Sequence, residues 1–364
     1  MTSGKRVCMS LGWMVLVGGA IVPPSHATTT VYDNPVVKSY AEDKRNCSGL
    51  TVLPVECRFP RYYRVRRIEG LANPIALNNV GQVVGQTPGA DHRWHAAVWS
   101  KGSVTDIGML GCRETVSYCQ AWAKAANDLG QVVGETSDYD IFSPYYQHAF
   151  VWTAGTMSRL PEPGPEWSSA TDINNNGVIV GYGRAVPDYL EHGWVNNGGN
   201  FTVIGDYGES GRAYAVNENN QVVGGITFNA FLLSGDTMTI LGSLGGSGAV
   251  AYDINDAATP NVIGVSNSTQ NQRRGFLWRP GVMFDLDVLP GADFSIARAI
   301  NNRGQIVGQS GEQAVLWQNG EMREINRYLN PNAPRMRNAL DIDKRGKILA
   351  QGQDGAYYLL NPRY

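Results

Sequence analysis

One short phrase recurs along the chain, and its spacing constrains the fold more than any other feature. It reads INNRGQIVGQS at 300–310, with close copies ALNNVGQVVGQT (76–87), AANDLGQVVGET (125–136), DINNNGVIVGYG (172–183) and AVNENNQVVGGI (215–226), and degenerate ones at 253–266 and 341–352. We call one polar residue the anchor of each copy: Asn78, Asn127, Asn174, Asn217, Asn255, Asn301 and Asp343. Repetition of one phrase at this period indicates an architecture built from copies of one supersecondary unit.

Each repeat contains four short apolar stretches and no segment with a helical pattern. The phrase itself supplies two, and a third follows it, as in HAFVW (148–152) or QAVLW (313–317). A turn with Gly then leads to a fourth, as in TMTILGSL (237–244). Short strands that are apolar on both faces, four to a repeat, are typical of the blades of a β-propeller. The sequence therefore predicts an all-β, seven-bladed β-propeller of four-stranded blades.

The two ends of the repeat region predict how the ring closes. The seventh copy ends near Asn361 and lacks an outermost strand, whereas RYYRVRRIEGL (61–71) precedes the first copy as a strand without a blade of its own. In a ring the first and last blades are neighbours, so we expect this N-terminal strand to pair into the last blade and cover its open edge. An open solenoid of the same units is the alternative, but it needs capping elements that the sequence does not offer.

The N-terminus has the pattern of a secretory signal peptide. Lys5 and Arg6 precede the apolar stretch 7–22, and small residues end it at Ala27. We therefore divide the chain into a signal peptide (1–27), an N-terminal extension (28–60) and the propeller (61–364). Cleavage removes Lys5 and Arg6 from the 30 Lys+Arg and leaves all 32 Asp+Glu, a net charge of −4. We expect a secreted or periplasmic monomer that neither inserts into membranes nor binds nucleic acid.

Four cysteines remain after the signal peptide, an even number that is typical of disulfides in exported proteins. Their order along the chain favours the pairs Cys47–Cys57 and Cys112–Cys119, although three connectivities are possible. A metal site that combined Cys112 and Cys119 with His92 or His95 would lack any tight ligand spacing. We predict disulfides, and no metal or other cofactor.

The phrases INNRGQIVGQS, QHAFVW and TMTILGSLGG resemble the HAF repeat of exported bacterial proteins, which takes its name from His148-Ala149-Phe150. The resemblance covers about residues 61–364. It implies an exported repeat protein with a propeller fold, and it supplies no catalytic residues. Later copies depart from the triplet and carry Asn229, Arg274, Gln313 or Gly355 in place of His.

Repeated residues that look catalytic have structural interpretations. His95, His148 and His192 occupy one repeat position, and other copies hold Asn, Arg, Gln or Gly there, so that position needs a polar residue and not an imidazole. The segment Asp172–Gly177 matches the start of a calcium loop, but Gly183 stands where the bidentate Glu would be. We therefore predict that this segment is the first turn of a blade.

Function is expected in the loops that differ between repeats. Copies one to three carry long loops at 86–94, 135–147 and 182–191, and the connection 111–122 is also long. These loops are expected to share one sector of the rim, where aromatic rings with a few polar groups suit a glycan or a peptide. The candidate ligand-binding residues are His92, Trp94, Asp138, Tyr139, Tyr145, Tyr146, Trp167, Asp188 and Tyr189.

Two functions follow from this rim. The first is a non-catalytic binding module for a glycan, a peptide or a surface protein. The alternative is a secreted glycan hydrolase or lyase in which Asp138 and Asp188, or His92 with a carboxylate, carry out acid–base chemistry. The sequence contains none of the usual nucleophile-elbow, zinc-protease or P-loop motifs, so we designate no catalytic residue.

The closure hypothesis is tested by removing the N-terminal strand. We expect deletion of residues 61–70 to lower the melting temperature measured by circular dichroism, because the last blade would lose its fourth strand. An unchanged melting temperature would contradict the predicted pairing.

Overall fold

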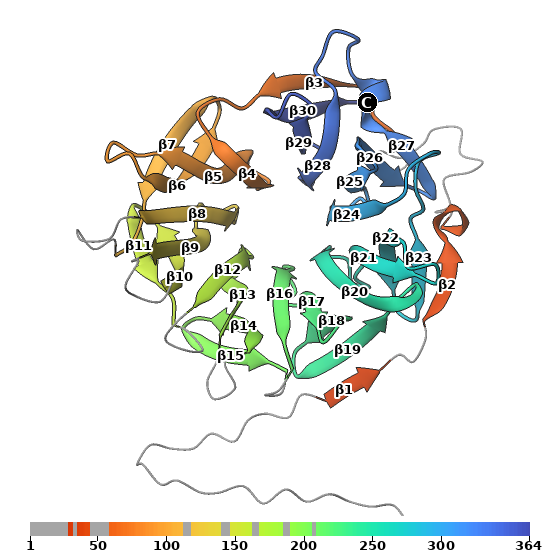
Figure 1. Cartoon of the computed structure of the whole chain (residues 1–364), viewed down its shortest axis with the longest axis horizontal. Helices are drawn as coiled ribbons and strands as arrows, with labels where there is room; N and C mark the ends of the chain where they lie inside the picture. The colour runs from red at the N-terminus through yellow and green to blue at the C-terminus, as the bar shows by residue number, and fades with distance from the viewer. Residues whose placement is uncertain are drawn as a thin grey trace, which may run out of the picture.

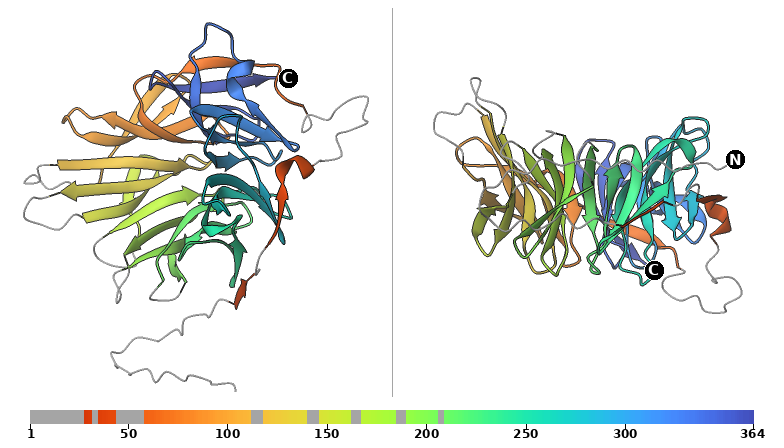
Figure 2. Two further views of the ribbon diagram at one scale, coloured as in Figure 1. Left: turned by 45° about the vertical axis from the view of Figure 1, so that its right-hand side comes forward. Right: turned by 90° about the horizontal axis from the view of Figure 1, so that it is seen from below.

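The computed structural model describes residues 28–31, 35–43, 58–111, 118–139, 146–161, 167–184, 190–205 and 209–364. Apart from two short 3₁₀ helices, η1 (Tyr40–Glu42) and η3 (Ile325–Tyr328), the regular elements of these residues are strands. No helix in this described part of the chain is long and apolar enough to cross a bilayer. Figure 1 shows the sheets arranged radially about a central axis, and Figure 2 shows that the ring is wider than it is thick.

The strands form four-stranded antiparallel meanders, which we call units and number along the chain. Unit 1 contains β4 (Ala72–Leu77), β5 (Gln82–Pro88), β6 (Trp94–Ser100) and β7 (Ser103–Gly108). Unit 2 contains β8 (Tyr118–Ala126), β9 (Val132–Tyr139), β10 (Tyr146–Thr153) and β11 (Thr156–Arg159). Unit 3 contains β12 (Ser168–Ile173), β13 (Val178–Arg184), β14 (Glu191–Asn197) and β15 (Asn200–Ile204). One bridge between Trp94 and Gln120 joins units 1 and 2 into a single sheet.

The remaining units follow the same order. Unit 4 contains β16 (Gly211–Val216), β17 (Val222–Ile226), β18 (Asn229–Ser234) and β19 (Thr237–Gly242). Unit 5 contains β20 (Gly245–Ile254), β21 (Val262–Ser268), β22 (Arg273–Arg279) and β23 (Val282–Asp285). Unit 6 contains β24 (Ser295–Ile300), β25 (Ile306–Ser310), β26 (Gln313–Gln318) and β27 (Glu321–Glu324). Unit 7 has β28 (Met336–Ile342), β29 (Ile348–Gly352) and β30 (Tyr357–Arg363), and β3 (Tyr62–Arg67) is its fourth strand.

The described residues before unit 1 lie on the outside of the ring. β3 pairs antiparallel with β30, with Tyr62 opposite Arg363. Upstream, β1 (Thr28–Val31) and β2 (Val36–Ser39) add as parallel fifth strands to β19 and β23 (Figure 1). Tyr40 is buried against unit 5 and unit 6 residues, and Asp43 forms an ion pair with Arg279. The described part of the extension therefore packs on the ring.

The anchor residues explain why the phrase repeats. Each is buried at the end of an inner strand, and in six copies its side-chain oxygen accepts the amide of the residue four positions later, as Asn78 does from Gln82 at 2.8 Å. Asn255 accepts the amide of Asn261 instead. In five copies the side-chain NH₂ group also donates to the carbonyl of the next anchor at 2.8–3.1 Å. These inter-unit bonds run from Asn78, Asn127, Asn174, Asn217 and Asn301. One side chain thus fixes its own turn and the neighbouring unit.

A second series of bonds runs through the residue after each anchor. The amide of Asn79 donates to Asp128, that of Asp128 to Asn175, and so on around the axis at 2.8–3.2 Å. Lys344 in unit 7 donates its amide to Asn79 in unit 1 at 2.9 Å. Hydrogen bonds therefore join the last unit to the first as well as each unit to the next.

The Gly of the phrase is required by a bulge in the inner strand. In unit 4 the register shifts between Ala213 and Ala215, and in unit 6 between Ala297 and Ala299. A Cβ atom on Gly224 would lie 2.0 Å from the carbonyl oxygen of Arg212 on the bulged strand, which no side chain tolerates. Gly is therefore needed in the Val-Val-Gly pattern because the adjacent inner strand carries one extra residue at that point.

The hydrophobic core lies between the units. Val223 and Leu232 of unit 4 pack on Phe276 and Trp278 of unit 5. Leu77 and Trp99 of unit 1 pack on Leu349 and Leu359 of unit 7. The apolar residues on the two faces of a strand therefore pack against the two neighbouring units.

The anchor bonds generate a prediction that one turn can test. Replacement of Asn217 by Ala removes the cap on Gln221 and leaves the buried carbonyl of Asn255 without its donor, so we expect the free energy of unfolding to fall by about 2–3 kcal/mol. Asn219 lies in the same turn but is exposed, and Asn219→Ala should change the free energy of unfolding by less than about 0.5 kcal/mol. Denaturant unfolding of both variants is the measurement, and equal effects would contradict the role of the anchor.

Candidate functional site

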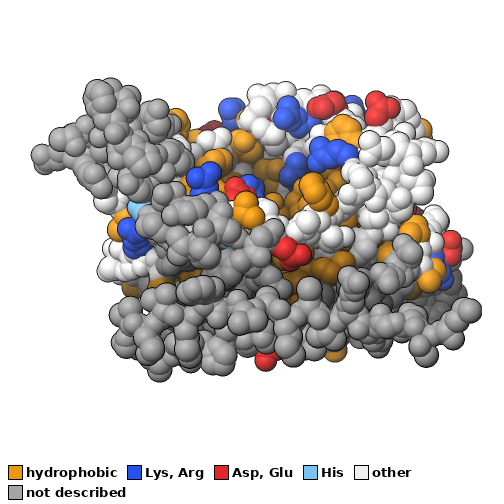
Figure 3. Space-filling model, turned by 60° about the horizontal axis from the view of Figure 1, so that its bottom comes forward, with side chains coloured by type: hydrophobic (Ala, Val, Ile, Leu, Met, Phe, Trp, Pro, Cys, Tyr) orange, Lys and Arg blue, Asp and Glu red, His pale blue; other side chains and the backbone are white. Residues whose placement is uncertain are grey.

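The extra residue of each inner strand points to a cavity at the centre of the ring. It lies three positions before the anchor, and its side chain lines one cavity of about 510 Å³ in all seven units. These residues are Ile75, Lys124, Thr171, Tyr214, Tyr252, Arg298 and Leu340. β-bulges commonly redirect a side chain in this way. The volume suits a small ligand or the end of a larger one, and Figure 3 shows a hollow on one face of the ring.

Arg298 is the cation of this cavity that lacks an acidic partner among the described residues. Its guanidinium is half-buried, and its Nε donates to Oδ1 of Asn338 at 3.0 Å. Burial lowers the pKa of Arg298 from its ordinary value, and the neighbouring Tyr252 opposes that shift. A half-buried guanidinium with free N–H groups is suited to bind a carboxylate.

Aromatic rings form a row that leads out of the cavity. Tyr214 and Tyr252 pack edge to face with ring centres 5.6 Å apart. Tyr182 lies 6.4 Å from Tyr214, and Trp167 lies 5.2 Å from Tyr182. The guanidinium of Arg212 covers the Tyr182 ring at 4.4 Å and forms an ion pair with Glu191. We call Trp167, Tyr182, Tyr214 and Tyr252 the aromatic row.

The charge of Lys124, unlike that of Arg298, is neutralised by a carboxylate. Its Nζ lies 2.5 Å from Oε2 of Glu135 and 2.8 Å from Oγ of Ser169. Glu135 also accepts from Gln147, which in turn accepts from Nε1 of Trp167. This network ties one end of the aromatic row to the wall of the cavity, so Trp167 and Lys124 are held in fixed positions.

Three carboxylates, two positions before the anchors of units 3, 5 and 7, line both this cavity and a second one, and we call the two cavities together the channel. Asp172, Asp253 and Asp341 each accept an amide of their own strand and an amide of the next unit, such as Val216 for Asp172 at 2.9 Å. Burial raises the pKa of Asp172 to about 6 and that of Asp341 to about 7, and it also raises the pKa of Asp253 well above its ordinary value. These carboxylates act mainly as links between units.

The opposite end of the channel is polar and mostly acidic. A second cavity of about 360 Å³ shares Asp172, Asp253 and Asp341 with the first and is lined by four of the anchors and by the residue that follows each of the seven anchors. These following residues include Asp128, Glu218 and Asp256, and the Nζ of Lys344 lies 3.7 Å from Oδ2 of Asp128. No group of three acidic, His or Cys side chains among the described residues is placed to hold a metal ion. The channel therefore has one aromatic, cationic end and one acidic end.

The predicted ligand-binding residues do not all lie at the channel. Trp167 belongs to the aromatic row beside the cavity, whereas His92 and Trp94 lie in and after the β5–β6 loop of unit 1 and line none of the channel cavities. Trp94 is 38% exposed, and the backbone of His92 has a positive φ. Tyr145, Asp188 and Tyr189 lie outside the described residues, as do the side chains of Asp138, Tyr139 and Tyr146. A shared ligand site for the full nominated set stays a prediction.

The cysteine pairs also stay predictions. Cys119 is buried at the start of β8, and Cys47, Cys57 and Cys112 lie outside the described residues. The repeated histidines have partners of their own. His95, for example, lies between the carboxylates of Asp91 and Asp106, at 3.0 and 2.8 Å. His192 is buried in β14, which agrees with a structural position.

Sequence reasoning missed the bulge residues. It placed Trp122 in a connecting loop, but β8 begins at Tyr118, so Trp122 is part of an inner strand and lines the cavity. A signal was present, because six of the seven copies read Ala-x-Ala or Ala-x-Asp before the anchor, as in AKAAN, ATDIN, AYAVN and ARAIN, and the first copy reads Pro-x-Ala. The residue x differs between copies, whereas its two neighbours are nearly constant, and x is the residue whose side chain enters the channel.

Comparison with known proteins identifies the fold alone. No family model matches the sequence, and no curated protein matches it significantly. The structure is similar to "the beta-propeller domain of the Trilobed protease from Pyrococcus furiosus", described as having an open velcro topology, with TM-score 0.54, 10% identity and coverage of 84% of this chain and 96% of that one. It is also similar to "YCF48 bound to D1 peptide" (0.49, 10%, 84% and 96%) and to the "WD40 beta propeller domain of Doa1" (0.45, 12%, 82% and 97%). The all-β prediction and the propeller architecture are confirmed at this level.

The channel carboxylates predict a pH dependence of stability. An acid whose pKa is higher in the folded chain than in the unfolded chain stabilises the fold most below pH about 4, and that contribution is lost as the pH rises through the folded pKa. The stability difference between the native sequence and Asp172→Asn should therefore shrink, on the order of 1–2 kcal/mol, between pH 4 and pH 7.5. Denaturant unfolding at both pH values measures this, with the exposed Asp236→Asn as control. A difference that grows with pH would contradict the assignment.

Proposed function

We propose that the chain is an exported, non-catalytic binding module that receives its ligand at the aromatic end of the central channel. Its scaffold is a seven-bladed β-propeller in which each unit is a blade and β3 closes the last one. The bonds from Lys344 to Asn79 and from Leu77 to Asp341, together with the pairing of β3 with β30, support this closure. The N-terminal charge pattern and the resemblance to HAF-repeat proteins support export.

The ligand that we propose is a glycan or a peptide that carries a carboxylate group. The observation that carries this proposal is the half-buried guanidinium of Arg298, without an acidic partner among the described residues, beside Tyr252 in a cavity of about 510 Å³. The aromatic row offers ring faces and edges for a sugar ring or an aliphatic side chain. A uronic acid and a peptide carboxylate share the chemistry that Arg298 would bind.

The carboxylates of the cavity favour binding over catalysis. Asp172, Asp253 and Asp341 each hold two backbone amides, a use that fixes them as acceptors within the fold. General acid–base work needs a carboxyl group that can approach the scissile bond. We therefore retain binding as the proposed function.

The test begins with glycan and peptide arrays probed with the mature protein, and continues with calorimetry on the strongest ligand. Tyr252→Ala and Arg298→Gln should each raise its Kd by at least about tenfold, because they remove a ring contact and a charge-assisted hydrogen bond. A ligand whose carboxylate is amidated should bind the native protein weakly and be insensitive to Arg298→Gln. Trp94→Ala, outside the cavity, is the matched control. Weakening by Trp94→Ala alone, or cleavage of the ligand, would contradict the proposal.

A further inference from the structure

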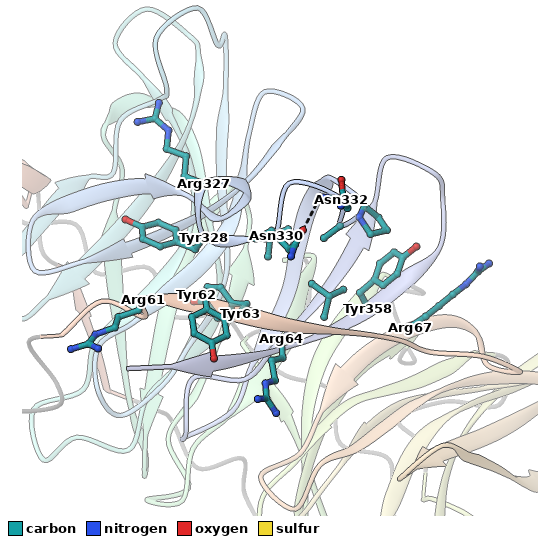
Figure 4. A pocket seen from close by; sticks show the side chains of 14 residues that line it. Arg61, Tyr62, Tyr63, Arg64, Arg67, Arg327, Tyr328, Asn330, Asn332 and Tyr358 are labelled. Atoms are coloured by element: carbon teal, nitrogen blue, oxygen red, sulfur yellow. Dashed lines mark hydrogen bonds between the residues drawn. The ribbon is translucent and has the colours of Figure 1, made fainter.

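A groove of about 930 Å³ lies on the outside of the ring, along the edge of unit 7 and away from the channel. β3 forms one wall, and the segment 327–334 before β28 forms the other (Figure 4). The lining includes Arg61, Arg64, Arg67 and Arg327, and it contains no Asp or Glu, although Arg327 forms an ion pair with Glu324 at 3.0 Å. Figure 4 shows Arg61, which precedes β3, and Arg64 and Arg67 of β3 spaced along this segment. The groove is therefore a positively charged surface on a protein whose mature net charge is negative.

β3 is an edge strand, so half of its backbone groups point away from its one neighbour, β30. The amide of Ile68 donates to Tyr357 on β30 at 2.9 Å. Bonded and non-bonded residues alternate in an antiparallel pair, so Tyr63, Val65 and Arg67 point their N–H and C=O groups away from β30. Pro362, which has no N–H, stands opposite Tyr63, as this alternation requires. Edge groups of this kind are a template for an added strand.

The ring already accepts added strands at equivalent positions. β1 pairs in parallel with β19, the outer strand of unit 4, and β2 pairs in parallel with β23, the outer strand of unit 5. An extended segment on the outer edge of a unit is therefore part of this fold. In unit 7 the corresponding edge belongs to β3, where Tyr62 is 47% exposed.

We propose that β3 binds an extended acidic segment of another protein, which adds to unit 7 as a fifth strand. The edge amides of Tyr63, Val65 and Arg67 would bind its backbone. Arg64 and Arg67 lie on opposite faces of β3, and together with Arg61 they would bind carboxylates on both faces of the added segment. The arginines also decide against a second copy of this chain, because pairing β3 with itself would place arginine against arginine. This proposal does not depend on the channel site.

The probe is a fluorescent peptide of alternating Glu and Thr, measured by fluorescence anisotropy on the full mature protein. It should bind the native protein, and a Lys-Thr peptide of equal length should not. Arg64→Glu should raise the Kd of the Glu-Thr peptide by at least about tenfold. Arg337→Glu, an exposed arginine on β28 outside the groove, is the matched control and should have little effect.

The backbone contribution is tested separately. Val65→Pro removes one outward amide without removing a bond to β30, since proline is accepted at such edge positions, and it should weaken binding while the melting temperature is retained. If that variant loses stability, a Glu-Thr peptide N-methylated at alternate residues tests the same bonds on the native protein and should fail to bind. Equal binding of the methylated peptide would overturn strand addition.

Equally tight binding of single-stranded DNA, or an equal effect of Arg337→Glu, would show that the groove is a general polyanion surface. Either result would also overturn the proposal.

Discussion

The hydrogen bonds of the anchor asparagines are the constraint on which the rest of the structure depends. An asparagine side chain carries both an acceptor and donors, so one residue can cap the turn of its own unit and bind the carbonyl of the next. Both partners are buried, so water cannot replace a missing bond at low cost. The unit-to-unit geometry is therefore set at the end of each inner strand, and the apolar contacts between sheets fill the space that these bonds define.

The bulge in each inner strand follows from the same arrangement and determines what the centre of the ring contains. Except for Pro74 in unit 1, its flanking positions hold Ala or a bonded Asp, and the opposing Gly of the next strand makes room for the displaced backbone. The bulged side chain alone is free to vary, and it ranges from Ile75 through Tyr214 to Arg298. The scaffold therefore separates positions that maintain the ring from one position in each unit that sets the chemistry of the channel.

The strands could be predicted from the sequence because the phrase carries their turns, their alternation and their spacing. The N-terminal strand also stood out, since RYYRVRR alternates without a unit of its own. The channel residues could not be found in this way. A bulge shifts the register by one residue, and strand periodicity assumes an unshifted ladder. Trp122 was misplaced for a related reason, because the long connection after Gly111 hid the early start of β8. That Arg298 has no acidic partner among the described residues depends on side chains of distant segments, which the sequence alone does not bring together.

The five anchor-to-anchor bonds all run in one direction around the axis, from one unit to the following one. A fragment that ended between units would have an unused donor at one end and an unused carbonyl at the other, and the two ends would fit each other. Such head-to-tail surfaces build open filaments when they meet between molecules. We therefore expect a half-made or cleaved chain of this type to polymerise, whereas in this structure Lys344 and Asp341 of unit 7 bond to Asn79 and Leu77 of unit 1 and cover these surfaces.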